Sequence, residues 1–126
     1  MAQSIARQKS YDFAVLIVDF CAKLKGQRQY EIACQLLRSG TSIGANVEEA
    51  LAGSSRKDFF AKMCIASKED RETNYWLRLI RDTAITDDVR TETLIELSEE
   101  LIKILTSIVK TGYGDSKPDT NAKMQN

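Results

Sequence analysis

This chain of 126 residues contains no histidine, so carboxylates are the side chains whose spacing best suits a chemical role. The absence of histidine excludes Ser-His-Asp and Cys-His nucleophilic sites, histidine acid–base catalysis and most zinc sites. Glu69 and Glu72 stand three residues apart, on one face of a helix. An all-carboxylate metal site would need partners from a facing helix, for which the candidates are Glu96, Glu99 and Glu100.

The competing interpretation is that Glu69 and Glu72 form ion pairs while the later glutamates face water. Charge runs on bundle helices favour this interpretation. The sequence also offers no nucleophile–base pair, and Gly40-Thr-Ser-Ile-Gly44 lacks the spacing of a phosphate-binding loop. We therefore expect no metal, no cofactor and no enzyme activity.

Polar side chains recur every three or four residues along two successive helical segments. Antiparallel pairing would bring the two strips together with opposite charges available on each side, and buried charges must be paired. We expect a buried polar network that fixes helix register; the alternative places the strips at the bundle rim, in water. The candidate residues are Arg38, Ser42, Asn46 and Glu49 on the first segment and Lys62, Glu69 and Glu72 on the second.

Basic residues cluster near helix ends and are the candidates for contact with nucleic acid. The expected contact residues are Lys23, Lys25, Arg28, Arg56 and Lys57, which an antiparallel bundle would gather on one end. Few aromatic residues stand among them, so contact would be with the RNA or DNA backbone and would be salt-sensitive. The chain has 18 basic and 18 acidic side chains, and this neutral balance argues against a dedicated nucleic-acid binder.

Four helical segments must position these residues. The first two are predicted to span about 10–25 and 28–52. The third follows a turn at residues 53–55 and ends at about 82, and the fourth follows a turn at residues 84–88 and ends at about 111. The expected caps are Ser10, Ser54 or Ser55, and Thr86, and the expected stops are Gly26 and Gly112. Short connections favour an all-α, antiparallel up-down-up-down four-helix bundle over residues 1–111. Residues 112–126 have almost no apolar content and are predicted to form a disordered C-terminal tail.

Apolar spacing indicates how the helices pack. Along the third segment, core candidates alternate in fours and threes, as in the seam of a bundle. They are Phe59, Met63, Ala66, Asp70, Thr73, Leu77 and Ile80. Residues 13–21 are apolar almost all round, which predicts a second buried side and hence a partner subunit. Gly40 and Gly44 each cost a helix about 1 kcal/mol relative to alanine. Close approach of another helix is the expected reason for them.

The cysteines and the N-terminus indicate a compartment. Cys21, Cys34 and Cys64 match no metal or redox spacing, and residues 1–10 lack the apolar core of a signal peptide. The longest unbroken apolar run, residues 14–18, is far too short to span a membrane. A reducing, cytoplasmic location without membrane contact is the expectation.

Three segments resemble the four-helix-bundle proteins encoded in 23S ribosomal RNA intervening sequences. They are Gln35-Leu-Leu-Arg-Ser-Gly-Thr-Ser-Ile-Gly-Ala-Asn-Val-Glu-Glu-Ala50, Asp58-Phe-Phe-Ala-Lys-Met63 and Lys68-Glu-Asp-Arg-Glu-Thr-Asn-Tyr-Trp-Leu77. The resemblance covers about residues 9–110. It implies an up-down bundle that associates into ring-shaped homopentamers and carries no catalytic residues.

That family is also similar to accessory proteins of diversity-generating retroelements, basic pentamers that bind a reverse transcriptase and nucleic acid. The present chain departs from them in its zero net charge. The function implied is a non-enzymatic, homo-oligomeric scaffold contacting RNA, DNA or a nucleic-acid-processing protein. The alternative is a protein–protein adaptor with no affinity for nucleic acid.

Overall fold

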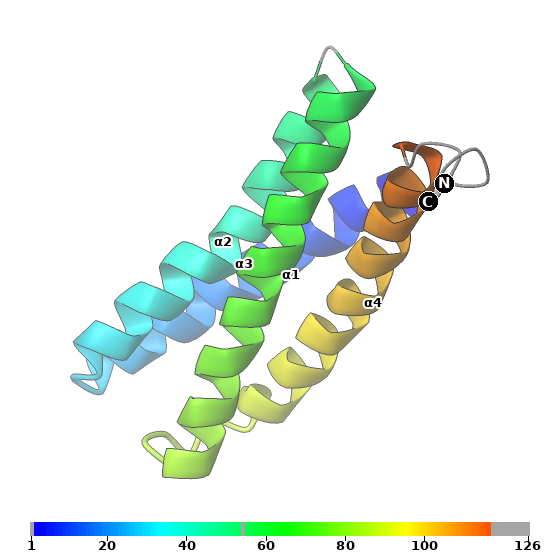
Figure 1. Cartoon of the computed structure of the whole chain (residues 1–126). Helices are drawn as coiled ribbons and strands as arrows, with labels where there is room; N and C mark the ends of the chain where they lie inside the picture. The colour runs from blue at the N-terminus through cyan, green and yellow to red at the C-terminus, as the bar shows by residue number, and fades with distance from the viewer. Residues whose placement is uncertain (1, 54, 117–126) are drawn as a thin grey trace.

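Four antiparallel helices form the part of the chain that the computed structural model describes, residues 2–53 and 55–116, with side chains described to residue 112. The helices are α1 (Ala2–Gly26), α2 (Tyr30–Ala52), α3 (Arg56–Thr83) and α4 (Arg90–Ser116). Each packs on the next one along the chain and α1 also packs on α4, whereas the diagonal pairs, α1 with α3 and α2 with α4, lie further apart (Figure 1). The predicted all-α, up-down bundle is confirmed.

The bundle core follows the predicted seam of α3. Met63, Ala66, Leu77 and Ile80 are fully buried there, and Phe13, Ile17 and Phe20 of α1 lie in the same core. Each large apolar side chain removed from water contributes about 1.5–3 kcal/mol. Periodic burial of this kind is what holds four helices of different length together.

Close packing explains the glycines in α2. A Cβ at position 40 would lie 2.8 Å from Cγ2 of Ile17, and one at position 44 would lie 3.3 Å from the carbonyl oxygen of Ser10. A side chain at position 40 would displace the side chain of Ile17, and one at position 44 would need the backbone of α1 to move by a few tenths of an ångström. The predicted reason for Gly40 and Gly44 is therefore confirmed, and their neighbour is α1.

Two helix starts differ from the prediction, and one agrees. Ser55 caps α3 as expected, accepting a hydrogen bond of 3.0 Å from the backbone N–H of Asp58. Ser10 caps nothing, because α1 begins at Ala2 and the buried Ser10 hydroxyl donates to the carbonyl of Arg7. α4 begins at Arg90, and Thr86 instead accepts the N–H of Asp88 within the preceding loop.

The end of α4 also differs from the prediction. Gly112 was expected to stop the helix, but α4 continues through it to Ser116. Gly112 is buried against the ring of Phe60, which leaves no room there for a Cβ. The glycine thus serves helix packing. The remainder of the expected tail, residues 117–126, lies outside the described residues.

No helix in the described part of the chain is long and apolar enough to cross a membrane.

Candidate interfaces

The two polar strips predicted from the sequence meet between α2 and α3. Arg38 donates a hydrogen bond of 2.7 Å to Glu72, and Lys62 donates one of 2.9 Å to Glu49. Burial differs from the expectation, since the side chains of Arg38 and Glu49 are 56% and 60% exposed. Long charged side chains reach water over the edge of a bundle, and such exposed pairs contribute about 0–1 kcal/mol. The two ion pairs therefore lie at the rim of the bundle, on its surface.

The other predicted members of the network do not bridge the helices. The Ser42 hydroxyl donates to the carbonyl of Arg38 at 2.6 Å, and the Asn46 amide donates to the carbonyl of Ser42 at 2.8 Å, both within α2. Glu69 contributes a buried carboxylate oxygen, Oε1, with no hydrogen-bond partner among the described residues. The strips are therefore two cross-helix ion pairs with local hydrogen bonds between them.

Beside the two strips lies a layer of fully buried polar side chains. Its residues Ser39, Asp70 and Thr73 each directly follow a residue of a strip, and Ser98 joins them from α4. The Thr73 hydroxyl donates to the Ser39 hydroxyl at 2.9 Å, joining α3 to α2. The Ser98 hydroxyl donates to Asp70 at 3.0 Å, joining α4 to α3. All four residues are completely buried. The sequence did indicate this layer, because Asp70 and Thr73 are polar residues at predicted core positions of the α3 seam.

The candidate metal-site carboxylates point toward different helices. Glu72 accepts hydrogen bonds from Arg38 of α2 and from Nε1 of Trp76, so it faces away from α4. Glu100 of α4 pairs with Lys9 of α1 at 3.1 Å. Within the described residues, no three acidic or cysteine side chains gather closely enough to hold a metal ion.

The basic residues expected to share one end of the bundle are separated. Lys25 and Arg28 lie at the α1–α2 turn, whereas Arg56 and Lys57 begin α3 beside the α2–α3 turn, at the opposite end (Figure 1). Successive turns of an up-down bundle alternate between its two ends, and the expected single basic surface is therefore wrong. Lys23 is engaged within the protein, 3.6 Å from Oδ2 of Asp88.

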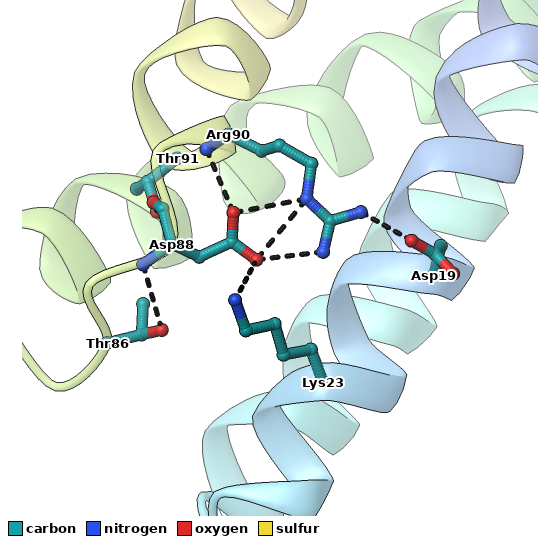
Figure 2. Close-up of polar contacts among 6 residues, drawn as sticks. All are labelled: Asp19, Lys23, Thr86, Asp88, Arg90 and Thr91. Atoms are coloured by element: carbon teal, nitrogen blue, oxygen red, sulfur yellow. Dashed lines mark hydrogen bonds and ion pairs between the residues drawn. The ribbon is translucent and has the colours of Figure 1, made fainter.

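Asp88 is the centre of a charged cluster that ties α1 to the start of α4 (Figure 2). Its carboxylate accepts the backbone N–H of Arg90 at 2.9 Å and the guanidinium of Arg90 at 2.8 Å. The same guanidinium reaches Asp19 of α1 and lies 5.6 Å from the centre of the Phe20 ring. The hydrogen bonds from Arg90 hold the pKa of the buried Asp88 carboxyl at about 2, below its ordinary value.

A stripe of exposed apolar side chains runs along α1 beside α2. Tyr11, Val15 and Val18 are 60%, 53% and 51% exposed, although they follow a helical stripe of threes and fours. We call this stripe, with Ala14 of α1 and Thr41 and Ala45 of α2, the α1–α2 apolar face. Residues Tyr11, Ala14, Thr41, Gly44, Ala45 and Glu48 line a shallow cavity of about 300 Å³ on it.

Comparison with known proteins now identifies the family. The family model for 23S rRNA-intervening sequence proteins matches residues 2–107, which include almost all of the four helices. The chain belongs to the 23S rRNA-intervening sequence protein family. The resemblance carried by the Arg-Ser-Gly-Thr-Ser-Ile-Gly-Ala-Asn segment is thereby confirmed.

A solved structure supports the same assignment for this 23S rRNA-intervening sequence protein. It is the crystal structure of a protein of unknown function from the S23 ribosomal protein family of Bacteroides thetaiotaomicron VPI-5482. The two are 41% identical with a TM-score of 0.82, over 87% of this chain and 99% of that chain. No significant match was found among curated proteins.

In this family member, the segment that carried the resemblance is a packing surface. Its residues Ser39, Gly40, Ile43 and Gly44 are buried, with Ser39 bonded to α3 and the two glycines against α1. Arg38, which precedes them, is exposed, and Ser42, which lies among them, is partly exposed. The residues of this segment specify contacts of α2 with α1 and α3.

Proposed function

We propose that the chain is a non-enzymatic scaffold that assembles into a homo-oligomer through its α1–α2 apolar face. The observation that carries the proposal is the exposed stripe of Tyr11, Val15 and Val18. Contiguous apolar surface rimmed by polar residues marks interaction sites on proteins. Burying each of these side chains against another subunit would contribute about 1.5–3 kcal/mol.

The chemistry around the stripe fits a second copy of the same chain. Ala14, Gly44 and Ala45 form a floor of small residues, which lets another helix approach closely. At the edge, Arg7 and Glu48 neutralise each other through an ion pair of 2.9 Å, so no unpaired charge would have to be buried there. The family resemblance implies that the assembly is a ring of five.

The scaffold would act by contacting RNA, DNA or a nucleic-acid-processing protein. This part of the proposal is supported by exposed basic side chains that take part in no ion pair within the described part of the chain. Lys103 and Lys110 are two of them. Phosphate contacts weaken steeply as salt is raised, whereas apolar docking of a protein partner does not. Salt-independent capture of a protein, with no nucleic-acid affinity, would instead support the adaptor function.

Solution mass tests the assembly. Light scattering coupled to size exclusion, at low and high salt, should give a species near five times 14.2 kDa. Val15→Glu with Val18→Glu should dissociate it while circular dichroism shows intact helices. The matched control is Val89→Glu, because Val89 is 88% exposed but lies in the α3–α4 loop, away from the face. A wild-type monomer, or a double variant that keeps the wild-type mass, would overturn the proposal.

A further inference from the structure

A cationic groove runs between α3 and α4. Its lining residues are Arg71 of α3 and Ile102, Lys103, Thr106, Ser107, Lys110 and Thr111 of α4, which we call the α3–α4 groove. The groove is open and holds about 580 Å³. Three of its side chains are cations, three carry hydroxyl groups and none is acidic. The nearest glutamates along α4, Glu99 and Glu100, lie about one turn before Lys103 and mark the end of the basic stretch.

The cations of the groove are free to bind a ligand. Arg71 donates one hydrogen bond of 3.2 Å across the groove to the Thr106 hydroxyl, which leaves its remaining N–H groups available. Lys103 and Lys110 have no ion-pair partner among the described residues. By contrast, Lys9 and Lys62 are both neutralised by glutamates of neighbouring helices.

The donors form a row and not a single point. Lys103 and Lys110 are seven residues apart on one face of α4, which separates them by about 10.5 Å along the helix axis. Thr106 and Ser107 lie between them, and Arg71 approaches the middle of the row from α3. A row of this length matches an extended polyanion with regularly spaced charges better than one small anion.

The groove lies on the opposite side of the bundle from the α1–α2 apolar face. α1 contacts α2 and α4 but not α3, and α2 does not contact α4, so the outer surfaces of the two helix pairs face away from each other (Figure 1). Assembly through the α1–α2 face would leave every α3–α4 groove in water. The assembly would then present one copy of the groove per subunit.

We propose that the α3–α4 groove binds the phosphodiester backbone of a nucleic-acid strand. Lys103, Arg71 and Lys110 contact successive phosphates, and the hydroxyl groups donate to phosphate oxygens. No aromatic side chain lines the groove, so bases are not stacked and the sequence is not read. The inference rests on the nucleic-acid contact proposed above and is independent of the assembly.

The test measures binding of a labelled single-stranded RNA by fluorescence anisotropy, from about 50 to about 200 mM salt. Lys103→Gln with Lys110→Gln should weaken binding about tenfold at the lowest salt and reduce the slope of log affinity against log salt by about 1.4. Arg38→Gln with Lys62→Gln removes the same formal charge from the α2–α3 rim, where both side chains are already paired with glutamates, and should change affinity less than about twofold. Single-stranded DNA of the same sequence shows whether the 2′-hydroxyl contributes.

Each contrary result has a distinct meaning. If both double variants lose RNA affinity equally, or if poly-glutamate displaces RNA from the wild type and the groove variant equally, the groove is not the binding site. Nucleic acid or another polyanion would then bind elsewhere on the chain. No RNA binding by the wild-type chain at the lowest salt would overturn both the groove and the proposed nucleic-acid contact. Light scattering on both variants should return the wild-type mass, which separates either failure from a failure of assembly.

Discussion

Ser98 donates a hydrogen bond of 3.0 Å to Asp70 across the α3–α4 interface, at a point where neither side chain touches water. The other carboxylate oxygen of Asp70, Oδ2, has no hydrogen-bond partner among the described residues. Burial raises the pKa of Asp70 to about 7, against the opposing effects of the Ser98 hydrogen bond and the charge of Arg71. The core therefore contains a carboxyl group that is neutral in mild acid and becomes charged near neutral pH.

Asp70 should make the bundle less stable as pH rises. Its folded pKa of about 7 lies above the ordinary 3.8, so the folded state binds the proton more tightly between these values. The free energy of unfolding should fall from about pH 4 upward and level off above about pH 7, by up to about 4 kcal/mol. Asp70→Asn should remove this dependence and be the more stable protein at pH 8, as measured by urea unfolding across the range. Parallel pH profiles for the two proteins would contradict the assignment.

Asp88 should act in the opposite direction. Its folded pKa of about 2 lies below the ordinary 3.8, so its stabilisation is complete above about pH 4 and disappears as pH falls toward 2. Asp88→Asn retains an acceptor for the Arg90 N–H but removes the charge, and should cost about 2 kcal/mol at neutral pH. Thermal unfolding at pH 7 and pH 2.5 measures the difference, which should shrink in acid. Asp87→Asn, at the exposed neighbour, is the control and should leave stability unchanged.

The close approach of α1 and α2 should make Gly40 intolerant of substitution. Gly40→Ala places a methyl group 2.8 Å from Cγ2 of the buried Ile17, and overpacking of this kind costs about 1–3 kcal/mol. Gly26→Ala meets nothing within 4 Å at a position with ordinary negative φ, and should be neutral or stabilise by up to about 1 kcal/mol. Denaturant midpoints compare the two. Equal midpoints would show that α1 shifts at little cost.

The three cysteines should differ in reactivity. Cys21 is buried, which raises the pKa of its thiol to about 12, whereas Cys34 and Cys64 are exposed. In a Cys34→Ser chain, a disulfide reagent at mildly alkaline pH should modify Cys64 in the native protein and Cys21 only after unfolding, because the thiolate is the reacting form. Mass spectrometry of the labelled peptides identifies the modified site. Fast native labelling of Cys21 would mean that the α1–α2 core opens readily.

Helix spacing predicted the fold because burial repeats with the helical period. Met63, Ala66, Leu77 and Ile80 occupy the predicted seam and are all buried. Helix ends were less predictable, since they depend on contacts with other helices. Gly112 does not end α4, and the ring of Phe60 packs where a Cβ at position 112 would lie. The two residues are 52 positions apart, so no local sequence pattern reveals this contact.

The candidate interfaces were only partly predictable, for two physical reasons. Spacing indicated which strips of α2 and α3 would meet, but neighbouring positions such as Arg38 and Ser39 differ by one step of the helix, and only packing decides which is buried. The α3–α4 groove combines Lys103 and Lys110, whose spacing is visible in the sequence, with Arg71, which joins them only after folding.

The link between Asp19 and Arg90 also has a kinetic consequence. These residues are 71 positions apart, so a contact between the first and last helices closes a longer loop than contacts between helices that are adjacent along the chain. The other three contacting helix pairs are adjacent along the chain and can form locally, while loop closure carries an entropic cost that grows with length. We expect the α1–α4 seam to form last during folding, after the three local helix hairpins. The charged cluster around Asp88 would then stabilise the folded state by lowering the unfolding rate, and would not raise the folding rate.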